Sequence, residues 1–369
     1  MNRCLLSGLL ISVLFSSCQN RTTTDEAKNS AVLKPVIVTD TVASDTDDPA
    51  IWINTAHPEQ SIIIGTDKDE NGGLYAFDLQ GKILKERTVT GIKRPNNVDI
   101  AYKLALGDTT VDIAVVTERM THKLRVFSLP ELKPIDNGGI EVFEGETQEG
   151  YRDLMGIALY TDSSTNKIYA IVGRKTGPTE GGYLWQYVLE NNNGVVKATL
   201  VRKFGKYSGK KEIESIAVDN ELGYVYYSDE GVGVRKYYAQ PGKGDEELAL
   251  FATTGFTQDH EGISIYKVND GTGYILVSDQ QANRFHVFPR EGANGNPHEH
   301  PLIKSILFST MESDGSDVTN VALNEQFKSG LFVAMSTNKT FQFYRWEDIA
   351  GKDLKVAPNG AVVTALTSK

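Results

Sequence analysis

Three carboxylates crowd into one short stretch near the start of the chain. Asp45, Asp47 and Asp48 come directly before the apolar residues 50–53. Carboxylates this close repel one another, so solvent, a helix N-terminus or a hard cation has to offset their charge. Pro49 and the short apolar run favour a strand over a long helix. The stretch therefore fits either an acidic turn in water or part of a site for calcium, which takes roughly six to eight oxygen ligands.

Other polar residues repeat this placement along the chain. Several carboxylates stand just before later apolar runs: Glu214, Asp259, Glu261 and Asp314. The residues that follow the next apolar run are Lys68, Arg119 and Lys175 in the first half of the chain, and Glu230 and Gln280 in the second. Lys and Arg suit phosphate oxygens, and Arg can bind them in a bidentate manner. Carboxylate and amide oxygens suit calcium.

The elements that must position these residues are short β-strands. From residue 35 onward no amphipathic helix of useful length is found, and apolar runs alternate with Gly, Asn and Asp clusters. The runs group into six similar units that recur about every 54 residues. The first strand of each unit is predicted at residues 50–53, 98–102, 157–160, 216–218, 263–266 and 321–323.

Each unit contains further strands. The second strand is predicted at residues 62–66, 113–117, 169–173, 225–228, 274–278 and 331–335. An aromatic third strand is predicted at residues 74–77, 124–127, 183–187, 234–238, 285–288 and 341–344, and a fourth at positions such as 83–88 and 200–204. Three or four antiparallel strands repeated six times predict an all-β fold, a six-bladed β-propeller. A pair of β-sandwiches is the alternative, which the even spacing disfavours.

Propeller geometry places the charged residues on one face. The first strand of each blade lines the central channel, so the loop before it and the loop after the second strand open at the same end. This face is predicted to be divided into a basic part and an acidic part. An anionic substrate between them could meet calcium and fixed cations together, with a metal-activated water attacking phosphorus. The alternative is that each residue is an ordinary solvated loop side chain.

Composition narrows the class of protein. The chain has 369 residues, of which 40% are hydrophobic and 23% charged, as in folded globular proteins. The net charge of −10 argues against a nucleic-acid partner. Cys4 and Cys18 are the only cysteines. The folded part therefore has no disulfide, no cysteine nucleophile and no zinc–thiolate site.

The N-terminus has the features of a targeting segment. A short basic start and an apolar run precede Ser16, Ser17 and Cys18, which predicts a signal peptide at residues 1–17. The pattern resembles a bacterial lipoprotein box, with Cys18 as the lipidated first residue of the mature chain. Residues 18–34 are predicted to be a polar tether and residues 35–369 the propeller. The protein is thus expected to be exported and lipid-anchored to the cell envelope; the alternative is ordinary cleavage and a soluble exported protein.

Several motifs together resemble the β-propeller phytases. They are Asp47 to Trp52, Asn96 to Ile100, Glu214, the pair Glu261 and Gly262, and Trp346 to Ala350. The resemblance runs from about Asp45 to Ala350, which is nearly all of the folded chain. It implies a calcium-dependent phosphoric monoester hydrolase whose substrate is phytate, myo-inositol hexakisphosphate. Separately from this resemblance, the protein is expected to be a monomer that meets a membrane only through the lipid on Cys18.

The resemblance also implies roles for individual residues. Asp47 and Asp48 become calcium ligands, and Asn97 and Asp99 fall in a nearby structural calcium site. Residues at positions with calcium-binding or catalytic roles are Glu214, Glu230, Asp259, Glu261 and Gln280, and Asp314 joins the metal ligands. Phosphate binding falls to Lys68, Arg119 and Lys175, with Arg174 beside them. The catalytic set is Lys68, Arg119, Lys175, Glu214, Glu230 and Glu261.

The chain departs from the family pattern at four places. Met155 stands where relatives have a tyrosine that contacts phosphate, and Thr176 replaces an acid beside Lys175. Residues 177–182 form an insertion, and the acidic stretch 312–317 is shortened. Two other readings remain beside the enzyme: a surface propeller that binds an anionic ligand or partner without catalysis, and a lactonase-like metal-dependent propeller. The joint presence of the three cations and the glutamates favours the phytase.

Overall fold

The computed structural model of the chain describes residue 1 and residues 31–358. The predicted lipidation site at Cys18 and the rest of the predicted signal peptide and tether up to residue 30 lie outside the described residues. Leu33 falls in the predicted tether, and its backbone N–H donates to the Leu307 carbonyl at 2.8 Å. The propeller domain therefore begins no later than Leu33. In this described part of the chain, no helix has the length and apolar character needed to cross a membrane.

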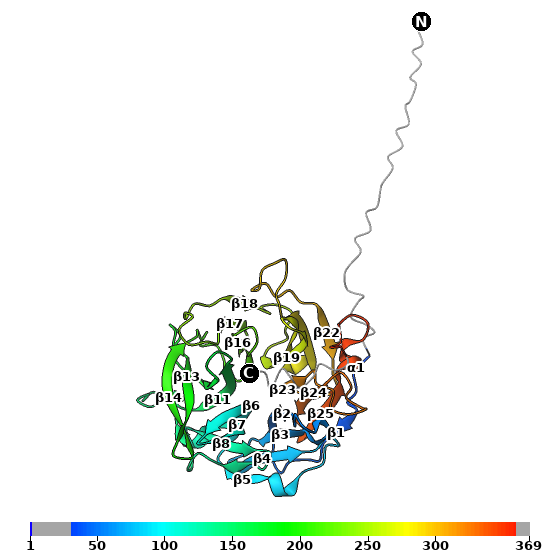
Figure 1. Cartoon of the computed structure of the whole chain (residues 1–369). Coiled ribbons are helices and arrows are strands. Elements are labelled where there is room, and N and C mark those ends of the chain that lie inside the picture. The colour runs from blue at the N-terminus through cyan, green and yellow to red at the C-terminus, as the bar shows by residue number, and fades with distance from the viewer. Residues whose placement is uncertain (2–30, 359–369) are drawn as a thin grey trace. The chain divides into compact units, whose positions relative to one another are not determined.

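Antiparallel sheets surround a central channel as the six blades of a β-propeller, which confirms the predicted fold class for residues 31–358 (Figure 1). Blade 1 contains β2 (Thr46–Trp52), β3 (Ile62–Asp67), β4 (Gly72–Phe77) and β5 (Val89–Ile92). Blade 2 contains β6 (Pro95–Leu106), β7 (Thr109–Glu118), β8 (Lys123–Leu129), β9 (Lys133–Pro134) and β10 (Ile140–Glu141). Blade 3 contains β11 (Leu154–Asp162), β12 (Lys167–Arg174), β13 (Leu184–Asn192) and β14 (Val195–Phe204).

The second half of the chain continues the ring. Blade 4 contains β15 (Ile216–Asp219), β16 (Tyr224–Asp229), β17 (Gly233–Tyr238) and β18 (Ala249–Phe251). Blade 5 contains β19 (His260–Asn269), β20 (Thr272–Asp279), β21 (Arg284–Pro289) and β22 (Lys304–Leu307). Blade 6 contains β23 (Ser316–Thr319), β24 (Leu331–Ser336), β25 (Thr340–Arg345) and, at its outer edge, β1 (Ile37–Val38). The inner strands around the channel are thus β2, β6, β11, β15, β19 and β23 (Figure 1).

The two ends of the domain close the ring together. β1 pairs antiparallel with β25, with Ile37 opposite Phe343. The last blade is therefore built from both ends of the described chain. The helices of the domain are short: α1 (Trp346–Ala350) follows β25 directly, and the 3₁₀ turns are η1 (Pro58–Gln60), η2 (Lys85–Arg87), η3 (Arg119–Thr121) and η4 (Gln280–Ala282).

Two strand predictions were wrong. The inner strand of blade 6 is β23, whereas the predicted residues 321–323 lie in the loop after it. Val321 and Leu323 are buried in the core, so the apolar pattern marked core residues outside the strand, while Asp317 made the true strand look polar. The predicted strand 83–88 of blade 1 contains η2 instead, and β5 begins at Val89.

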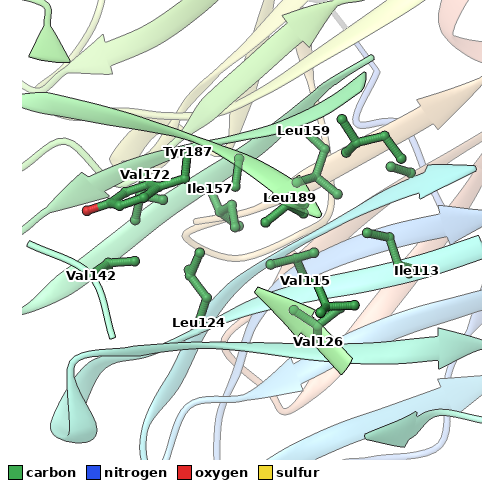
Figure 2. Close-up of a cluster of buried hydrophobic side chains, with 14 of the residues drawn as sticks. Ile113, Val115, Leu124, Val126, Val142, Ile157, Leu159, Val172, Tyr187 and Leu189 are labelled. Carbon is green, nitrogen blue, oxygen red and sulfur yellow. The ribbon is translucent and has the colours of Figure 1, made fainter. Parts of the chain in front are cut away.

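The hydrophobic core lies between the blades. Its buried side chains form clusters that each join two neighbouring blades. Figure 2 shows one of them, where Val115 and Leu124 of blade 2 face Ile157, Val172 and Tyr187 of blade 3. A single blade could not bury both of its faces, so stacking around the ring stabilises every sheet.

Candidate functional site

Four of the six inner strands have a β-bulge near the point where they begin. In blade 1 Thr46 pairs with Asp67 and Pro49 with Gly65, so β2 carries one residue more than β3 over this interval. The same shift occurs at residues 95–98, 154–157 and 260–263 of blades 2, 3 and 5. The bulges contain residues 47–48, 96–97, 155–156 and 261–262. A bulge changes the direction in which side chains point. Here it points the side chains of adjacent residues to two different parts of the channel.

Carboxylates gather at this end of the channel. We call them the rim carboxylates: Asp47, Glu214, Glu230, Asp259, Glu261 and Asp314. Glu214, Glu230 and Glu261 are all buried, and each offers one oxygen that lies within 4.8 Å of the others. These three glutamates come from blades 4 and 5, so the ring brings together residues far apart in sequence, as predicted.

Lys68 joins blade 1 to the same group. Its ammonium forms ion pairs with Asp47 and, at 3.1 Å, with Asp314 Oδ2, and it lies 3.9 Å from Glu214 Oε1. Burial alone would lower the pKa of Lys68, but the carboxylates of Asp47, Glu214 and Asp314 outweigh it and raise that pKa. Lys68 therefore sits among the carboxylates. The predicted division of the face into a basic part and an acidic part is wrong for this residue.

Burial and mutual repulsion raise the pKa values of several rim carboxylates. Burial raises the pKa of Glu261 well above its usual range, and the neighbouring Glu230 and Glu214 add to the effect. Burial and the charges of Glu214 and Asp259 raise the pKa of Glu230 to about 8. Burial also raises the pKa of Asp47, against the lowering effect of Lys68. A bound cation would relieve the repulsion that these shifts express.

Amide groups complete the rim. Asn96 donates through Nδ2 to Glu214 Oε1 at 2.7 Å and to Asp47 Oδ2 at 3.2 Å. Gln280 donates through Nε2 to Asp314 Oδ1. Among the residues that the structure describes, Asn96 Oδ1 and Glu261 Oε2 are buried oxygens without a hydrogen-bond partner. Unpartnered buried oxygens in an all-oxygen donor set fit a hard cation such as calcium.

The other two predicted cations lie next to the rim without joining it. Arg119 is buried, donates through Nε to the Leu154 carbonyl at 3.2 Å, and touches the Met155 sulfur. Lys175 is half-exposed and pairs with Glu212 Oε1 at 3.1 Å. Within residues 31–358, neither side chain forms an ion pair with a rim carboxylate. Their phosphate-binding role therefore stays a prediction.

Arg174 does not have the environment predicted for a phosphate-binding residue. Its side chain is fully buried, and its guanidinium pairs with Glu146 at 3.3 Å and donates to the carbonyls of Tyr183 and Gly182 at 3.1 Å each. It also lies 4.6 Å from the centre of the Phe143 ring. Successive residues of a strand point to opposite faces, so Arg174 is turned inward at the end of β12. It holds the inserted residues 177–182 against the blade.

A second set of carboxylates lines the channel, which encloses a cavity of about 880 Å³. We call Asp48, Asp99 and Asp317 the channel carboxylates. Each accepts a backbone N–H from the next inner strand: Asp48 from Val98 at 3.0 Å, Asp99 from Leu159 at 2.6 Å, and Asp317 from Ile51 at 2.8 Å. Burial raises the pKa of Asp99 to about 7 and that of Asp317 to about 6.

The predicted calcium-site residue Asn97 also lies in the channel lining, beside Asp48 and Asp99. Its Oδ1 is buried and has no hydrogen-bond partner in the described part of the chain. The structure thus separates Asp48, Asn97 and Asp99 from the rim and places them in the channel together. The calcium site predicted for Asn97 and Asp99 stays a prediction, because both Asp99 oxygens accept backbone N–H groups, from Ile100 at 2.7 Å and from Leu159 at 2.6 Å.

Sequence reasoning missed several residues of the site. Asn96 was part of the motif from Asn96 to Ile100 but was given no role, although it donates to two rim carboxylates. Lys211 forms an ion pair with Asp259, and Gln281 donates to the other Asp259 oxygen at 2.7 Å. Asp317 was hidden by the misplaced inner strand of blade 6. The pairing of Lys211 with Asp259 spans 48 residues, so no local pattern could have revealed it.

A propeller that collects buried oxygen ligands at one end of its channel, with basic side chains beside them, has the arrangement of a metal-assisted hydrolase of anionic esters. The family model described as "Phytase" matches residues 3–358. The chain is 30% identical over 334 residues to a 3-phytase of Bacillus subtilis (strain 168), covering 85% of this chain and 83% of that protein. A solved structure titled "Structure of Dos1 propeller" covers 81% of this chain and 67% of its own, with a TM-score of 0.42 and 12% identity.

The chain therefore belongs to the phytase family. The predicted enzyme class, a phytase that is a phosphoric monoester hydrolase, is confirmed by the same two comparisons. This assignment favours the enzyme over the non-catalytic surface propeller and over the lactonase-like propeller.

Proposed function

We propose that the chain hydrolyses phosphate monoesters of phytate with water as the nucleophile, in a reaction that depends on calcium. The observation that carries the proposal is the convergence of three buried glutamate oxygens, from Glu214, Glu230 and Glu261, within 4.8 Å of one another. Such a group is unfavourable without a cation. The family assignment supports phytate as the substrate.

The donor set favours calcium over softer metals. It contains carboxylate and amide oxygens, and the chain has no cysteine in the described domain. The residues that would hold the ion are the rim carboxylates, assisted by Asn96 Oδ1 and Gln280. Bound calcium would supply positive charge that offsets the carboxylates, stabilises the phosphate oxygens in the transition state and lowers the pKa of water.

The chain's own cations bind and orient the phosphate. Arg119 is fixed by the Leu154 carbonyl, so its guanidinium is preorganised for charge-assisted hydrogen bonds. Lys175, on the neighbouring blade, is half-exposed and can turn from Glu212 toward a phosphate oxygen. Lys68 contributes positive charge from within the rim. These three residues are assigned to stabilising the charge that develops on the transferred phosphoryl group.

Phosphate release from phytate tests this proposal. The protein is stripped with a chelator, assayed, and assayed again after addition of calcium or magnesium. We expect activity to disappear with the chelator and to return with calcium more fully than with magnesium, because magnesium demands a tighter octahedral set of ligands. Full activity in excess chelator would overturn calcium dependence.

We also propose that the protein is exported and anchored through a lipid on Cys18. The support is the sequence pattern at residues 1–18, where a short apolar run and two serines precede the cysteine. Cys18→Ala should move the protein from the membrane fraction to the soluble fraction or block its maturation. An unchanged membrane fraction would contradict the anchor.

A further inference from the structure

Asp259 differs from the other rim carboxylates in the way it is neutralised. Its Oδ1 forms an ion pair with Lys211, and its Oδ2 accepts a hydrogen bond from Gln281 Nε2 at 2.7 Å. Both carboxylate oxygens are therefore engaged. A metal ion that used Asp259 as a ligand would have to take at least one oxygen from these partners.

The ammonium of Lys211 is exposed enough to move away from Asp259. Its side chain is 43% exposed, compared with 14% for Lys68, which three rim carboxylates surround. Lys211 also lines a shallow hollow of about 340 Å³ beside the rim, together with Gly231, Thr253, Thr254, Gln258 and His260. Its four-carbon stem is flexible. The ammonium thus has room to move from Asp259 to water or into the hollow.

The pair lies close enough to the three glutamates to affect a cation there. The charge of Asp259 raises the pKa of both Glu230 and Glu261. His260, next to Asp259 in the chain, uses Nε2 to donate to the Ala252 carbonyl at 2.7 Å, which fixes the start of β19 around Asp259 and Glu261. Asp259 is therefore held at the edge of the glutamate group, with Lys211 on its outer side.

We propose that Lys211 is a built-in competitor of the metal: its ammonium occupies Asp259 in the metal-free protein, is displaced when calcium binds, and thereby sets the calcium affinity. This inference rests on the proposed function in that it takes the rim as the calcium site. Lys211 is a positioning residue in this scheme, because it acts through Asp259. The displaced ammonium remains at the margin of the rim, so calcium binding also turns a positive charge toward solvent, where it favours an anionic ligand.

The expected change in calcium affinity follows from the exposure of the ion pair between Lys211 and Asp259. Partly exposed ion pairs contribute little, which limits the competition to about 2- to 5-fold in affinity. Lys68 behaves differently, because it is buried and shared among three carboxylates. Its removal would leave buried charges unpaired and would destabilise the fold. Lys211 is therefore the residue at which competition can be measured without loss of the domain.

Calorimetric titration of the chelator-stripped protein with calcium tests the proposal. Lys211→Gln should bind calcium about 2- to 5-fold more tightly than the parent, and Lys211→Arg, which keeps the cation, should remain near the parent. Lys210→Gln is the matched control, because Lys210 is an exposed neighbour of the same charge that forms no ion pair among the described residues. Melting temperatures in chelator check that every variant is folded.

The outcomes separate this inference from the proposed function. Equal affinity of the parent and Lys211→Gln, or equal tightening in Lys210→Gln, would overturn the competition. Weaker binding by Lys211→Gln would also overturn it, because the ammonium would then be supporting the ligand. A parent protein that binds no calcium would instead refute calcium dependence itself.

Discussion

Asp47 and Asp48 are neighbours in the chain, yet they belong to two groups of carboxylates that are neutralised in different ways. Asp47 faces the rim, where Lys68 and Asn96 contact it. Asp48 faces the channel, where the backbone N–H of Val98 donates to it. The bulge in β2 separates the two side chains. Two adjacent aspartates thus contribute one carboxylate to the rim and one to the channel.

The difference lies in where the compensating charge comes from. Channel carboxylates accept backbone N–H groups from neighbouring inner strands, so they fasten blade 1 to blade 2, blade 2 to blade 3 and blade 6 to blade 1. Rim carboxylates converge on side chains and leave Glu261 Oε2 without a partner among the described residues. Carboxylates of one fold can therefore be structural in the channel and available to a cation at the rim.

The largest expected effect comes from removing a rim glutamate. Glu261→Gln keeps the shape but deletes one of three converging charges, so we expect phytate hydrolysis to fall by more than about 10²-fold. The stabilisation by calcium should shrink as well, because the same oxygen serves chemistry and metal binding. Phytate turnover and thermal melts with and without calcium measure both. Glu131→Gln is the control, since Glu131 is exposed and outside the site; a similar loss there would contradict the assignment.

Substitution of Arg119 should lower turnover without weakening calcium binding. Arg119→Ala removes a preorganised donor to the phosphate, and we expect about a 10²-fold loss of turnover with the calcium-dependent rise in melting temperature nearly intact. Arg119→Lys keeps the charge but loses the bidentate fork, so it should recover only part of the rate. Phytate hydrolysis at the parent rate by both Arg119→Ala and Lys175→Ala would refute their role.

The metal-free protein should lose stability as the pH rises. The folded-state pKa values of Asp317, Asp99 and Glu230 are raised to about 6, about 7 and about 8, above the values of an unfolded chain. The folded state therefore binds more protons between about pH 4 and pH 8, and stability falls across that window by about 1.4 kcal/mol per pH unit for each titrating group. Urea unfolding in chelator at pH 5 to 8 measures this slope, and calcium should flatten it.

The smallest expected effect concerns a channel carboxylate. Asp317→Asn replaces a carboxyl group, which the folded state favours in its protonated form, by a neutral amide. In chelator the stability of the variant relative to the parent should rise by about 1.4 kcal/mol between pH 5 and pH 8, because the folded parent loses that much as the pH passes the Asp317 pKa of about 6. Phytate turnover in calcium should stay close to normal. A variant that loses activity as Glu261→Gln does would show that rim and channel act as one site.

Much of the fold could be predicted because strand repeats and turn residues are local signals. Five of the six inner strands were predicted within a few residues of their positions. The sixth was missed because the strand is short and mostly polar, with Asp317 facing the channel, while Val321 and Leu323 fill the core from the loop after it. Hydrophobic patterning detects burial, and here burial and strand pairing fell on different residues.

The site could be predicted only in part. The types of residue that converge on the rim were identified from their places before and after the strands. What each side chain touches depends on the bulges and on contacts between distant blades, such as Lys68 with Asp314 and Lys211 with Asp259. Arg174 and Lys175 show the limit most clearly, because adjacent residues of like charge have opposite environments at the end of one strand.

The pairing of β1 with β25 has a consequence for how the protein is made. Ile37 finds its partner Phe343 only after nearly the whole domain has been synthesised, so no ribosome-bound chain that lacks blade 6 can complete the ring. Until then β1 has no strand to pair with, and the side of blade 1 that packs against blade 6 has nothing to cover it. Ring closure thus comes late in synthesis, only after β25 has been made, and a chain shortened before β25 would remain open with its blade edges free to aggregate.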